Sequence, residues 1–299
     1  MASAELFRPI QTADLPALLT TAQALDTALW GRPETDLDDL AHELSVSGPL
    51  AVSSRALLTS DGIDGFVLVR GSECALTVHP RPTSDQRAAV TSRLLSWART
   101  AGADEVDLAA PDTDLQDVAT ALGWQHTHSS HELLRRRHVP PPALPAGVRL
   151  RRFQPEQHAR AVHRMLYAFW AATPTHHDRP YHQWRELFID HPASLPDQQL
   201  VAWQDGEVVG AALGRIFTGD TGWILQLGVA PAARRRGLGR ALLCLAADRL
   251  AAAPGVQEVG LSVDATNDAA LELYRSAGFE VDRTYRRFTV QPQTERSNG

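Results

Sequence analysis

The chain has 299 residues, which exceeds what one hydrophobic core usually holds and predicts two domains. Hydrophobic residues make up 43% of it and charged residues 21%, as in globular proteins, so wholesale disorder is excluded. The net charge of −6 argues against general nucleic-acid binding, which needs a basic surface. All 29 basic residues are arginine, so chemistry that depends on a lysine amine is excluded.

Three features of the sequence bear on location. No run of eighteen apolar residues occurs, so we predict no transmembrane helix and no membrane partner. The first residues, Met1 to Glu5, lack a basic region followed by an apolar core, so we expect no secretory signal. Two cysteines, Cys74 and Cys244, are too few for a disulfide framework. We therefore expect a cytoplasmic protein.

A proline-rich segment divides the chain into halves of nearly equal length. Between residues 135 and 147, four prolines fall within six residues, a density that neither a helix nor a central strand tolerates. We predict a first domain over 1–139, an extended linker over 140–147 and a second domain over 148–290. The polar residues 291–299 are expected to form a disordered tail.

Hydrophobic periodicity and turn signals predict the same order of elements in both halves. In the first half we expect a start at Phe7, a helix over Leu15–Leu29, strands over Leu50–Leu58, Gly65–Arg70 and Cys74–Val78, a helix over Ala88–Thr100, a strand over Glu105–Ala109 and a helix over Leu115–Leu122. In the second half we expect a strand over Val148–Arg152, helices over Glu156–Ala172 and Tyr181–Ile189, strands over Leu200–Gln204, Glu207–Thr218 and Trp223–Val229, a helix over Gly237–Ala253, a strand over Glu258–Asp264, a helix over Asp268–Ser276 and a strand near Tyr285–Val290. The repeated order indicates an internal duplication.

One loop in the second half has the composition of an anion site. A predicted strand ends at Val229, and an arginine-glycine segment opens the next helix at Gly237. Backbone N–H groups at a helix start have no intrahelical partner, and the helix dipole adds partial positive charge there. Glycines at 237 and 239 let an anion approach the backbone. We call residues 234–240 the phosphate loop; its counter-charges are Arg234, Arg235, Arg236 and Arg240.

A second segment, residues 263–279, adds two polar side chains to this region. Asn267 follows a predicted strand, at the edge where open sheets bind ligands. Tyr274 comes seven residues later, two helical turns along the same face.

Together these two segments resemble the GCN5-related N-acetyltransferase (GNAT) family, which moves an acyl group from coenzyme A to an amine. The resemblance covers most of residues 148–290, and the order of the two halves is similar to that of tandem members such as mycothiol synthase. It implies an α/β (α+β) fold of two tandem GNAT-like domains. Each would have a mixed, mostly antiparallel sheet flanked by helices. In the second domain the strand at 223–229 would splay from that at 258–264, leaving a cofactor slot.

The resemblance also implies roles for individual residues. The cosubstrate would be acetyl-CoA, with no metal, and Tyr274 would face the sulfur as general acid for the leaving thiolate. The backbone N–H of Val229 would bind the oxyanion. The open alternative is that Tyr274 only packs in the core. The residues implied to bind the cofactor are Leu227, Gly228, Val229, Arg234, Arg235, Arg236, Gly237, Leu238, Gly239, Arg240, Asn267 and Tyr274.

The sequence does not identify the general base. Many family members use a glutamate on the strand before the phosphate loop, whereas here that strand contains Gln226 and no carboxylate. Asp264, a histidine of the acceptor-side helices or a water chain are the alternatives. The spacing of His176-His177-Asp178 fits no compact metal site, so we interpret these residues as solvent-facing. Several aromatic residues could line an acceptor pocket or pack in the core: Tyr167, Phe169, Trp170, Tyr181 and Trp184.

The first half departs from the family pattern. Residues 81–87 contain no glycine, and Ala119 stands where Tyr274 stands in the second half. We therefore predict that the first domain is degenerate and non-catalytic, binds no coenzyme A and serves as a structural partner that could wall the acceptor site.

The resemblance therefore implies an acyl-CoA-dependent N-acyltransferase, and we expect acetyl-CoA as donor and a primary amine of a small molecule as acceptor. A non-catalytic acyl-CoA sensor is the alternative, because the strand before the phosphate loop has no carboxylate. An arginine-rich nucleic-acid or protein-interaction domain is disfavoured by the negative net charge. No nucleic-acid partner is expected, and a homodimer stays open.

Overall fold

The computed structural model describes residues 6–290 except 82, 171–178, 192–193, 195 and 218–219. The chain forms two compact units: unit 1 comprises residues up to Ser130 together with those from Arg283 onward, and unit 2 comprises His131–Asp282. Each unit has its own hydrophobic cores. Within the described residues, no helix is long and apolar enough to cross a membrane.

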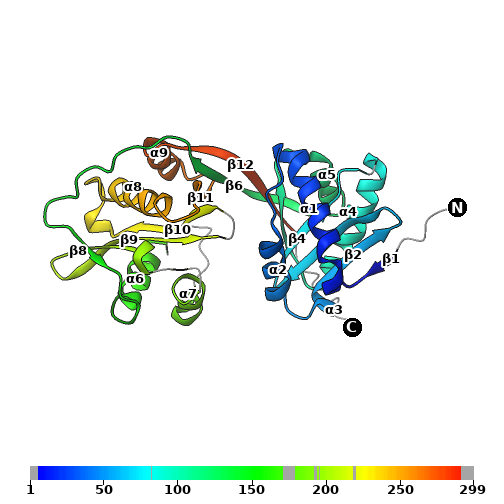
Figure 1. Ribbon diagram of the computed structural model, residues 1–299, viewed down its shortest axis with the longest axis horizontal. Helices are drawn as coiled ribbons and strands as arrows, with labels where there is room; N and C mark the ends of the chain where they lie inside the picture. Colours follow the sequence, from blue (N-terminus) through cyan, green and yellow to red (C-terminus); the bar gives the residue numbers. More distant parts are fainter. Residues whose placement is uncertain are drawn as a thin grey trace, which may run out of the picture. The chain divides into compact units, whose positions relative to one another are not determined.

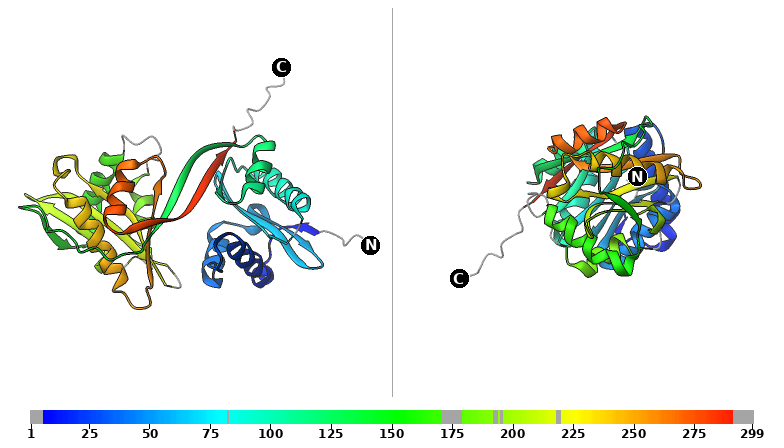
Figure 2. Two further views of the ribbon diagram at one scale, coloured as in Figure 1. Left: turned by 90° about the horizontal axis from the view of Figure 1, so that it is seen from above. Right: turned by 90° about the vertical axis from the view of Figure 1, so that its left-hand side faces the viewer.

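Unit 1 is an open sheet with helices on both faces. Its elements are β1 (Leu6–Arg8), α1 (Leu15–Trp30), α2 (Leu37–Val46), α3 (Leu50–Ser53), β2 (Ser54–Thr59), β3 (Gly62–Arg70), β4 (Glu73–Val78), α4 (Ser84–Thr100), β5 (Glu105–Ala109), α5 (Thr113–Ala121) and β6 (Gln125–Arg135). Strands β1 to β4 pair antiparallel in sequence order, and β4 pairs parallel with β5. Helix α1 lies on one face of these strands and α4 on the other (Figures 1 and 2).

Unit 2 repeats this arrangement. Its elements are β7 (Arg149–Arg152), α6 (Pro155–Trp170), α7 (Tyr181–Phe188), β8 (Leu200–Gln204), β9 (Glu207–Ile216), β10 (Thr221–Val229), α8 (Leu238–Ala251), β11 (Glu258–Asp264), α9 (Asp268–Ser276) and β12 (Phe279–Thr289). Strands β7 to β10 pair antiparallel, and β10 pairs parallel with β11. Helices α8 and α9 cover one face, and α6 and α7 cover the other (Figure 1). The order of elements confirms the predicted duplication and the mixed, mostly antiparallel α/β fold.

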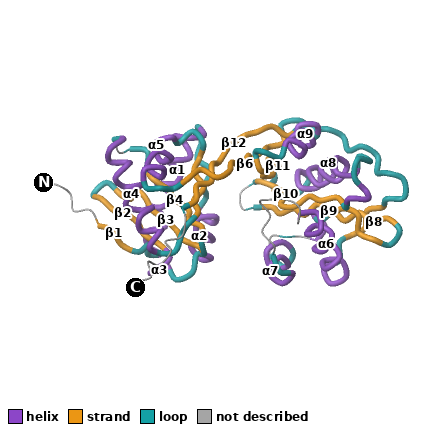
Figure 3. The backbone as a smooth tube through the Cα atoms, turned by 180° about the vertical axis from the view of Figure 1, so that it is seen from behind, coloured by secondary structure: helices purple, strands orange, loops and turns teal. Residues whose placement is uncertain are grey.

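Two long strands, β6 and β12, run from one unit into the other (Figure 3). From Arg283 onward β12 belongs to unit 1, where it pairs with β5 from Tyr285↔Ala109 to Thr289↔Glu105. The last part of β6 belongs to unit 2, where Leu133 is fully buried in the core beneath α8. The compact units therefore differ from the predicted domains 1–139 and 148–290, because each unit includes the end of a strand that begins in the other.

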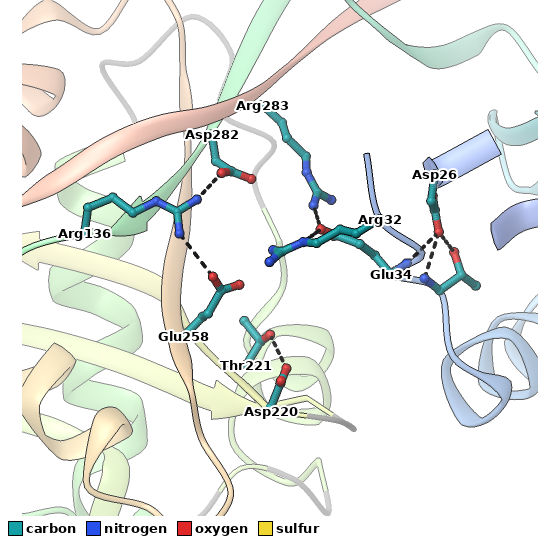
Figure 4. Close-up of polar contacts among 10 residues, drawn as sticks. Asp26, Arg32, Glu34, Arg136, Asp220, Thr221, Glu258, Asp282 and Arg283 are labelled. Atoms are coloured by element: carbon teal, nitrogen blue, oxygen red, sulfur yellow. Dashed lines mark hydrogen bonds and ion pairs between the residues drawn. The ribbon is translucent and has the colours of Figure 1, made fainter. Parts of the chain in front are cut away.

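The side chains of β12 show the same change of unit (Figure 4). Asp282 still pairs with Arg136 of unit 2, which also binds Glu258 at 3.1 Å. The next residue, Arg283, pairs with Glu34, which follows α1 of unit 1. Further along, Arg287 binds Asp107 of β5 through two hydrogen bonds of 2.9 and 2.6 Å. The alternation of apolar and polar residues along β12 does not reveal where the strand passes from one unit to the other. That point is set by ion pairs with residues distant in the sequence.

The proline-rich segment has no regular secondary structure, as predicted, yet it is part of unit 2 rather than a bridge between units. Val139, Leu144 and Val148 pack against the core beneath α8. The apolar side chains between the prolines thus hold the segment on the unit. Two more expectations change locally: residues 50–53 form α3 rather than the start of a strand, and α2 and β6 were not predicted.

Candidate active site

Strands β10 and β11 part in the middle of unit 2. Their parallel pairing runs from Thr221↔Glu258 to Ile224↔Leu261, while β10 continues to Val229 and β11 to Asp264. Beyond Ile224 the two strands leave an opening, which we call the slot. The splay implied by the family resemblance is present.

A β-bulge in β10 sets the directions of the side chains at the slot. The pairing with β9 shifts between Ile224 and Gln226. Before and after the bulge, the side chains of Ile224, Leu227 and Val229 pack toward the core beneath α8. Gln226 instead contacts Trp184 of α7, on the other face. Without the bulge, strict alternation would put Gln226 and Ile224 on one face.

The backbone of β10 presents free polar groups to the slot. The N–H of Ala230, directly after β10, donates to the carbonyl of Val209 in β9 at 2.9 Å. These two residues therefore form a hydrogen-bonded pair across the two strands. Hydrogen-bonded and non-hydrogen-bonded pairs alternate along an antiparallel ladder. The N–H groups of Val229 and Leu227 therefore point away from β9, toward the slot. These are the backbone groups expected to contact the pantetheine arm.

The two glycines of the phosphate loop differ in their roles. Gly237, which precedes α8, has φ +84°, a left-handed conformation that side chains disfavour. Gly239 is an ordinary helical residue, and a Cβ there would lie 3.6 Å from Val229 and 3.7 Å from Leu273, in normal contact. Gly237 is thus needed for the backbone turn before α8. Gly239, which has no side chain, leaves the surface at the start of the helix uncovered.

Three of the four loop arginines are engaged by protein oxygens. Arg234 donates to the Val229 carbonyl at 3.1 Å, and Arg240 donates to the Ser276 carbonyl at 3.1 Å. Arg236 donates to Gln204 and to the Ala146 carbonyl, both at 3.0 Å. Arg235, which has φ +58°, has no hydrogen bond or ion pair from its side chain within the described part of the chain. Of the four, it is the one best able to meet an incoming anion.

Asn267 and Tyr274 both belong to α9, on the β11 side of the slot. Asn267 is the N-cap of the helix, and its side-chain oxygen accepts the Ala270 N–H at 3.1 Å. The ring of Tyr274 is tilted against Phe279 at 6.4 Å between centroids. Burial raises the pKa of Tyr274 to about 12. We find no hydrogen bond to its hydroxyl from any residue that the structure describes.

A structural glycine, Gly278, follows this helix, where the sequence pattern predicts a glycine that ends it. Gly278 has φ +90°, and a Cβ there would lie 2.0 Å from the Arg137 carbonyl oxygen. Its own carbonyl accepts the N–H groups of Arg136 and Arg137. Only glycine allows the segment directly after β6 to pass this close, which explains the glycine that follows α9.

The histidines and aromatics of α6 and α7 form a cluster on the face opposite α8. His163 stacks on Tyr167 at 4.2 Å and meets the edges of Tyr181 and Trp184 at 5.5 and 5.1 Å. Its Nε2 lies 3.0 Å from the Arg179 carbonyl oxygen, so Nε2 carries the proton. The cluster is part of a buried core, as the packing interpretation predicted. His176-His177-Asp178 lies outside the described residues, as do the side chains of Phe169 and Trp170.

The proposed bases have different surroundings. Asp264 accepts hydrogen bonds from the Thr266 backbone N–H at 2.8 Å and hydroxyl at 2.6 Å, which hold the turn after β11. His158 is buried, accepts the Gln154 N–H at 3.1 Å, and has a pKa lowered by burial. Both side chains therefore have structural partners. In the described part of the chain, no group of three or more metal-ligating side chains is found.

Unit 1 has the same parted strands but a different loop. Strands β4 and β5 pair only at Glu73↔Glu105 and Cys74↔Val106. Where unit 2 has Asn267 as the N-cap of α9, unit 1 has Asp112 as the N-cap of α5. Asp112 is held by Arg87 of α4 through hydrogen bonds of 2.8 and 2.6 Å. A buried ion pair thus joins the two helices at the edge where unit 2 has its phosphate loop.

Known proteins match both the sequence and the fold. The model of the Acetyltransferase (GNAT) family matches residues 160–279. The mycothiol acetyltransferase of Thermobispora bispora is 30% identical to this chain, over 92% of this chain and 96% of its own length. The chain belongs to the GNAT family. It is an N-acetyltransferase.

Further GNAT proteins match over nearly the whole chain. The mycothiol acetyltransferase of Streptomyces griseus is 28% identical, over 92% of this chain and 98% of its own length. A GCN5-related N-acetyltransferase from Sphaerobacter thermophilus superposes with a TM-score of 0.80 at 24% identity, covering 95% of this chain and 94% of its own. A tandem GNAT protein from the clavulanic acid biosynthesis pathway gives 0.72 at 16% identity, covering 96% and 98%. Both structures share the fold of this chain, and the second of them is itself a tandem GNAT protein.

Proposed function

We propose that the chain transfers the acetyl group of acetyl-CoA to a primary amine of a small molecule by direct attack on the thioester, in unit 2. The observation that carries this proposal is the slot itself. Strands β10 and β11 part beyond Ile224↔Leu261, and the Val229 N–H points into the opening. The phosphate loop follows directly, at the start of α8.

The residues at the slot fit an acyl-CoA substrate. Free N–H groups at the start of α8 and the Arg235 guanidinium suit a pyrophosphate. Gly239 leaves the helix surface open where that anion would approach. The free N–H groups of Leu227 and Val229 suit the amides of a pantetheine arm. Acetyl-CoA is here the acyl donor, and it supplies the activated thioester.

Two groups of the chain have the chemistry that acetyl transfer needs. Negative charge grows on the thioester oxygen during attack, and a fixed N–H such as that of Val229 stabilises it. The sulfur leaves as a thiolate, and a protonated phenol can supply its proton. Tyr274 is protonated at neutral pH like an ordinary tyrosine, and burial, which raises its pKa to about 12, keeps it protonated further into the alkaline range. The acceptor amine must itself be deprotonated before attack, since an alkyl ammonium has a pKa of about 10.4.

The acceptor is proposed to be a small molecule that reaches the slot from the face of α6 and α7. The relatives from Thermobispora and Streptomyces are named for acetylating mycothiol, which supports a small-molecule acceptor for this chain. We further propose a cytoplasmic location, the compartment that supplies acetyl-CoA and keeps the buried Cys74 and Cys244 reduced.

The test is release of free thiol from acetyl-CoA by the full chain, with a panel of cysteinyl amino sugars, amino alcohols, amino acid amides and alkylamines. We expect thiol release that depends on an amine and an acetylated product of matching mass. Coenzyme A affinity is measured in parallel by calorimetry. Tight binding without amine-dependent release from any panel member would favour the acyl-CoA sensor instead. Absence of binding would refute both.

A further inference from the structure

Gln226 lies at the mouth of the slot, on the side of the acceptor. It precedes Leu227, the first residue whose free N–H faces the slot, and the bulge turns its side chain toward α6 and α7. Gln226 is only 7% exposed. If the phosphate loop holds the pyrophosphate of the acyl donor on the α8 face, the acyl group at the other end of the donor would emerge through the slot toward this side chain. Gln226 is therefore placed to meet the acceptor.

The orientation of the Gln226 amide is fixed by its neighbour. The indole Nε1 of Trp184 lies 2.8 Å from Gln226 Oε1. An indole N–H can only donate, so the amide oxygen must face Trp184. Trp184 is fully buried among the aromatic residues of α6 and α7, which prevents it from moving aside. Turning the amide over would bring two donors together in a buried place.

With its oxygen held by Trp184, Gln226 keeps its Nε2 group, two N–H donors and no lone pair, without a hydrogen-bond partner among the residues that the structure describes. Such a group cannot take a proton from the acceptor ammonium. It can donate to an oxygen, whereas a hydrocarbon in the same place would leave the amide without a partner. A hydrogen-bond donor at this position therefore favours acceptors that carry an oxygen there over acceptors that carry a hydrocarbon group.

We propose that Gln226 determines acceptor specificity by donating a hydrogen bond from Nε2 to an oxygen near the amine of the acceptor, with Trp184 as the positioning residue that fixes the amide. The inference rests on the proposed transfer reaction. It defines the acceptor class as amines that carry a hydroxyl, carbonyl or carboxylate oxygen close to the reacting nitrogen.

The experiment compares pairs of amines, each an amine whose oxygen can only accept a hydrogen bond and its hydrocarbon isostere, such as 2-methoxyethylamine and butylamine, with kcat/KM expressed per free-base amine because the oxygen lowers the pKa of the amine. The wild-type chain should prefer the oxygen-bearing member in kcat/KM by about tenfold, the value of one net hydrogen bond. Gln226→Glu keeps the shape and the Trp184 contact but offers lone pairs at neutral pH. It should raise the KM of the oxygen-bearing amine and bring the preference close to one, with coenzyme A affinity unchanged.

A matched pair of tryptophans separates positioning from packing. Trp184→Phe frees the amide to turn over and should weaken the preference between paired amines. Trp203→Phe is the control, because the Trp203 indole nitrogen is buried in the same core and bonds to nothing that the structure describes. It should leave the preference intact. If both variants lower turnover to the same extent and neither changes the preference between the paired amines, the role of Trp184 is packing alone.

The outcomes distinguish this inference from the proposed function. If the wild type releases thiol with amines but treats the paired amines alike, the role of Gln226 is refuted and the transfer reaction stands. The same holds if Gln226→Glu retains the preference. If no amine of the panel supports thiol release, the transfer reaction fails and the specificity role fails with it.

Discussion

Tyr285, near the C-terminus of the chain, pairs with Ala109 in the antiparallel ladder between β12 and β5. The ladder continues to Thr289↔Glu105, and Phe288 between them is only 4% exposed, in the core beneath α4. Unit 1 is thus completed by residues from the far end of the chain. Its stability must depend on them.

We predict that a chain ending at Asp282 destabilises unit 1 selectively. It loses the β12 ladder and the buried Phe288, and truncation of a buried Phe to Ala alone costs about 3–5 kcal/mol. Hydrogen exchange should show faster amide exchange in β5 and β4, with β9 in unit 2 much less affected. A chain ending at Val290 keeps the ladder and is the control. Equal protection of β5 in the two truncated chains would contradict the prediction.

The pairing of β12 with β5 also changes what is expected when the two halves of the chain are produced separately. A fragment of residues 1–139 contains the predicted first domain but lacks the β12 residues that pair with β5. We expect it to unfold at lower urea concentration than the same elements in the full chain. Adding residues 283–290 through a flexible linker after residue 139 should restore the midpoint. A fragment as stable as the full chain would show that the ladder adds little.

Local patterns made most of the fold and part of the site predictable. Periodicity located α1, α9, β5, β8 and β11 within a residue or two, and the glycines and arginines of residues 234–240 located the loop before α8. These features depend on neighbours in sequence. The family resemblance supplied the splay between β10 and β11.

What could not be predicted depends on contacts between distant residues. The exchange of β6 and β12 between units follows from pairings such as Arg287 with Asp107, which leave no periodic signal. The bulge at residues 224–226 appears only in the register with β9, and it decides which face Gln226 occupies. The Trp184–Gln226 hydrogen bond joins residues 42 apart.

The two loop glycines provide a prediction with a built-in control. Gly237→Ala places a Cβ at φ +84° and should cost about 1–2 kcal/mol in stability and distort the phosphate loop. Gly255→Ala, at φ +87° beyond the end of α8, carries the same strain away from the slot. Both should lower the melting temperature similarly, but only Gly237→Ala should weaken coenzyme A binding in calorimetry. Equal affinities would place the coenzyme elsewhere.

Gly239 tests the approach to the helix start. Gly239→Ala adds a Cβ in ordinary contact distance of Val229 and Leu273 and should leave the melting temperature near that of the wild type. Gly239→Val should project further into the path of the anion and weaken coenzyme A binding more than the alanine does. If even valine leaves the affinity unchanged, the pyrophosphate does not lie over α8.

The Arg87–Asp112 pair should matter for stability and not for the cofactor. Side-chain exposures of 11% and 4% make it a buried pair. Removing Asp112 leaves the buried Arg87 guanidinium with only the exposed Asp114 at 3.9 Å, and loss of one partner of a buried pair costs about 3–5 kcal/mol. Asp112→Ala should therefore lower the free energy of unfolding by that amount, measured in urea, without changing coenzyme A affinity. Replacing both residues with apolar ones of similar size should recover much of the loss. A change in coenzyme A affinity on Asp112→Ala would mean that unit 1 binds the cofactor.

Tyr274→Phe removes one hydroxyl and almost no packing, and we predict a fall in kcat of about 10²–10⁴-fold with unchanged coenzyme A affinity.

The pH profile of the reaction tests the same role of Tyr274 in a second way. Because burial raises the pKa of Tyr274 to about 12, above the value of about 10 in an unfolded chain, the acid keeps its proton in the folded state as pH rises from 7 to 10. The rate with saturating acetyl-CoA should therefore climb with deprotonation of the amine and show no descending limb below about pH 10. Above that pH the unfolded chain loses the proton first, so this residue favours unfolding progressively up to about pH 12. A descending limb near pH 8 that vanishes in Tyr274→Phe would give the tyrosine a lowered pKa, and normal turnover of the variant would leave Tyr274 a residue of the core.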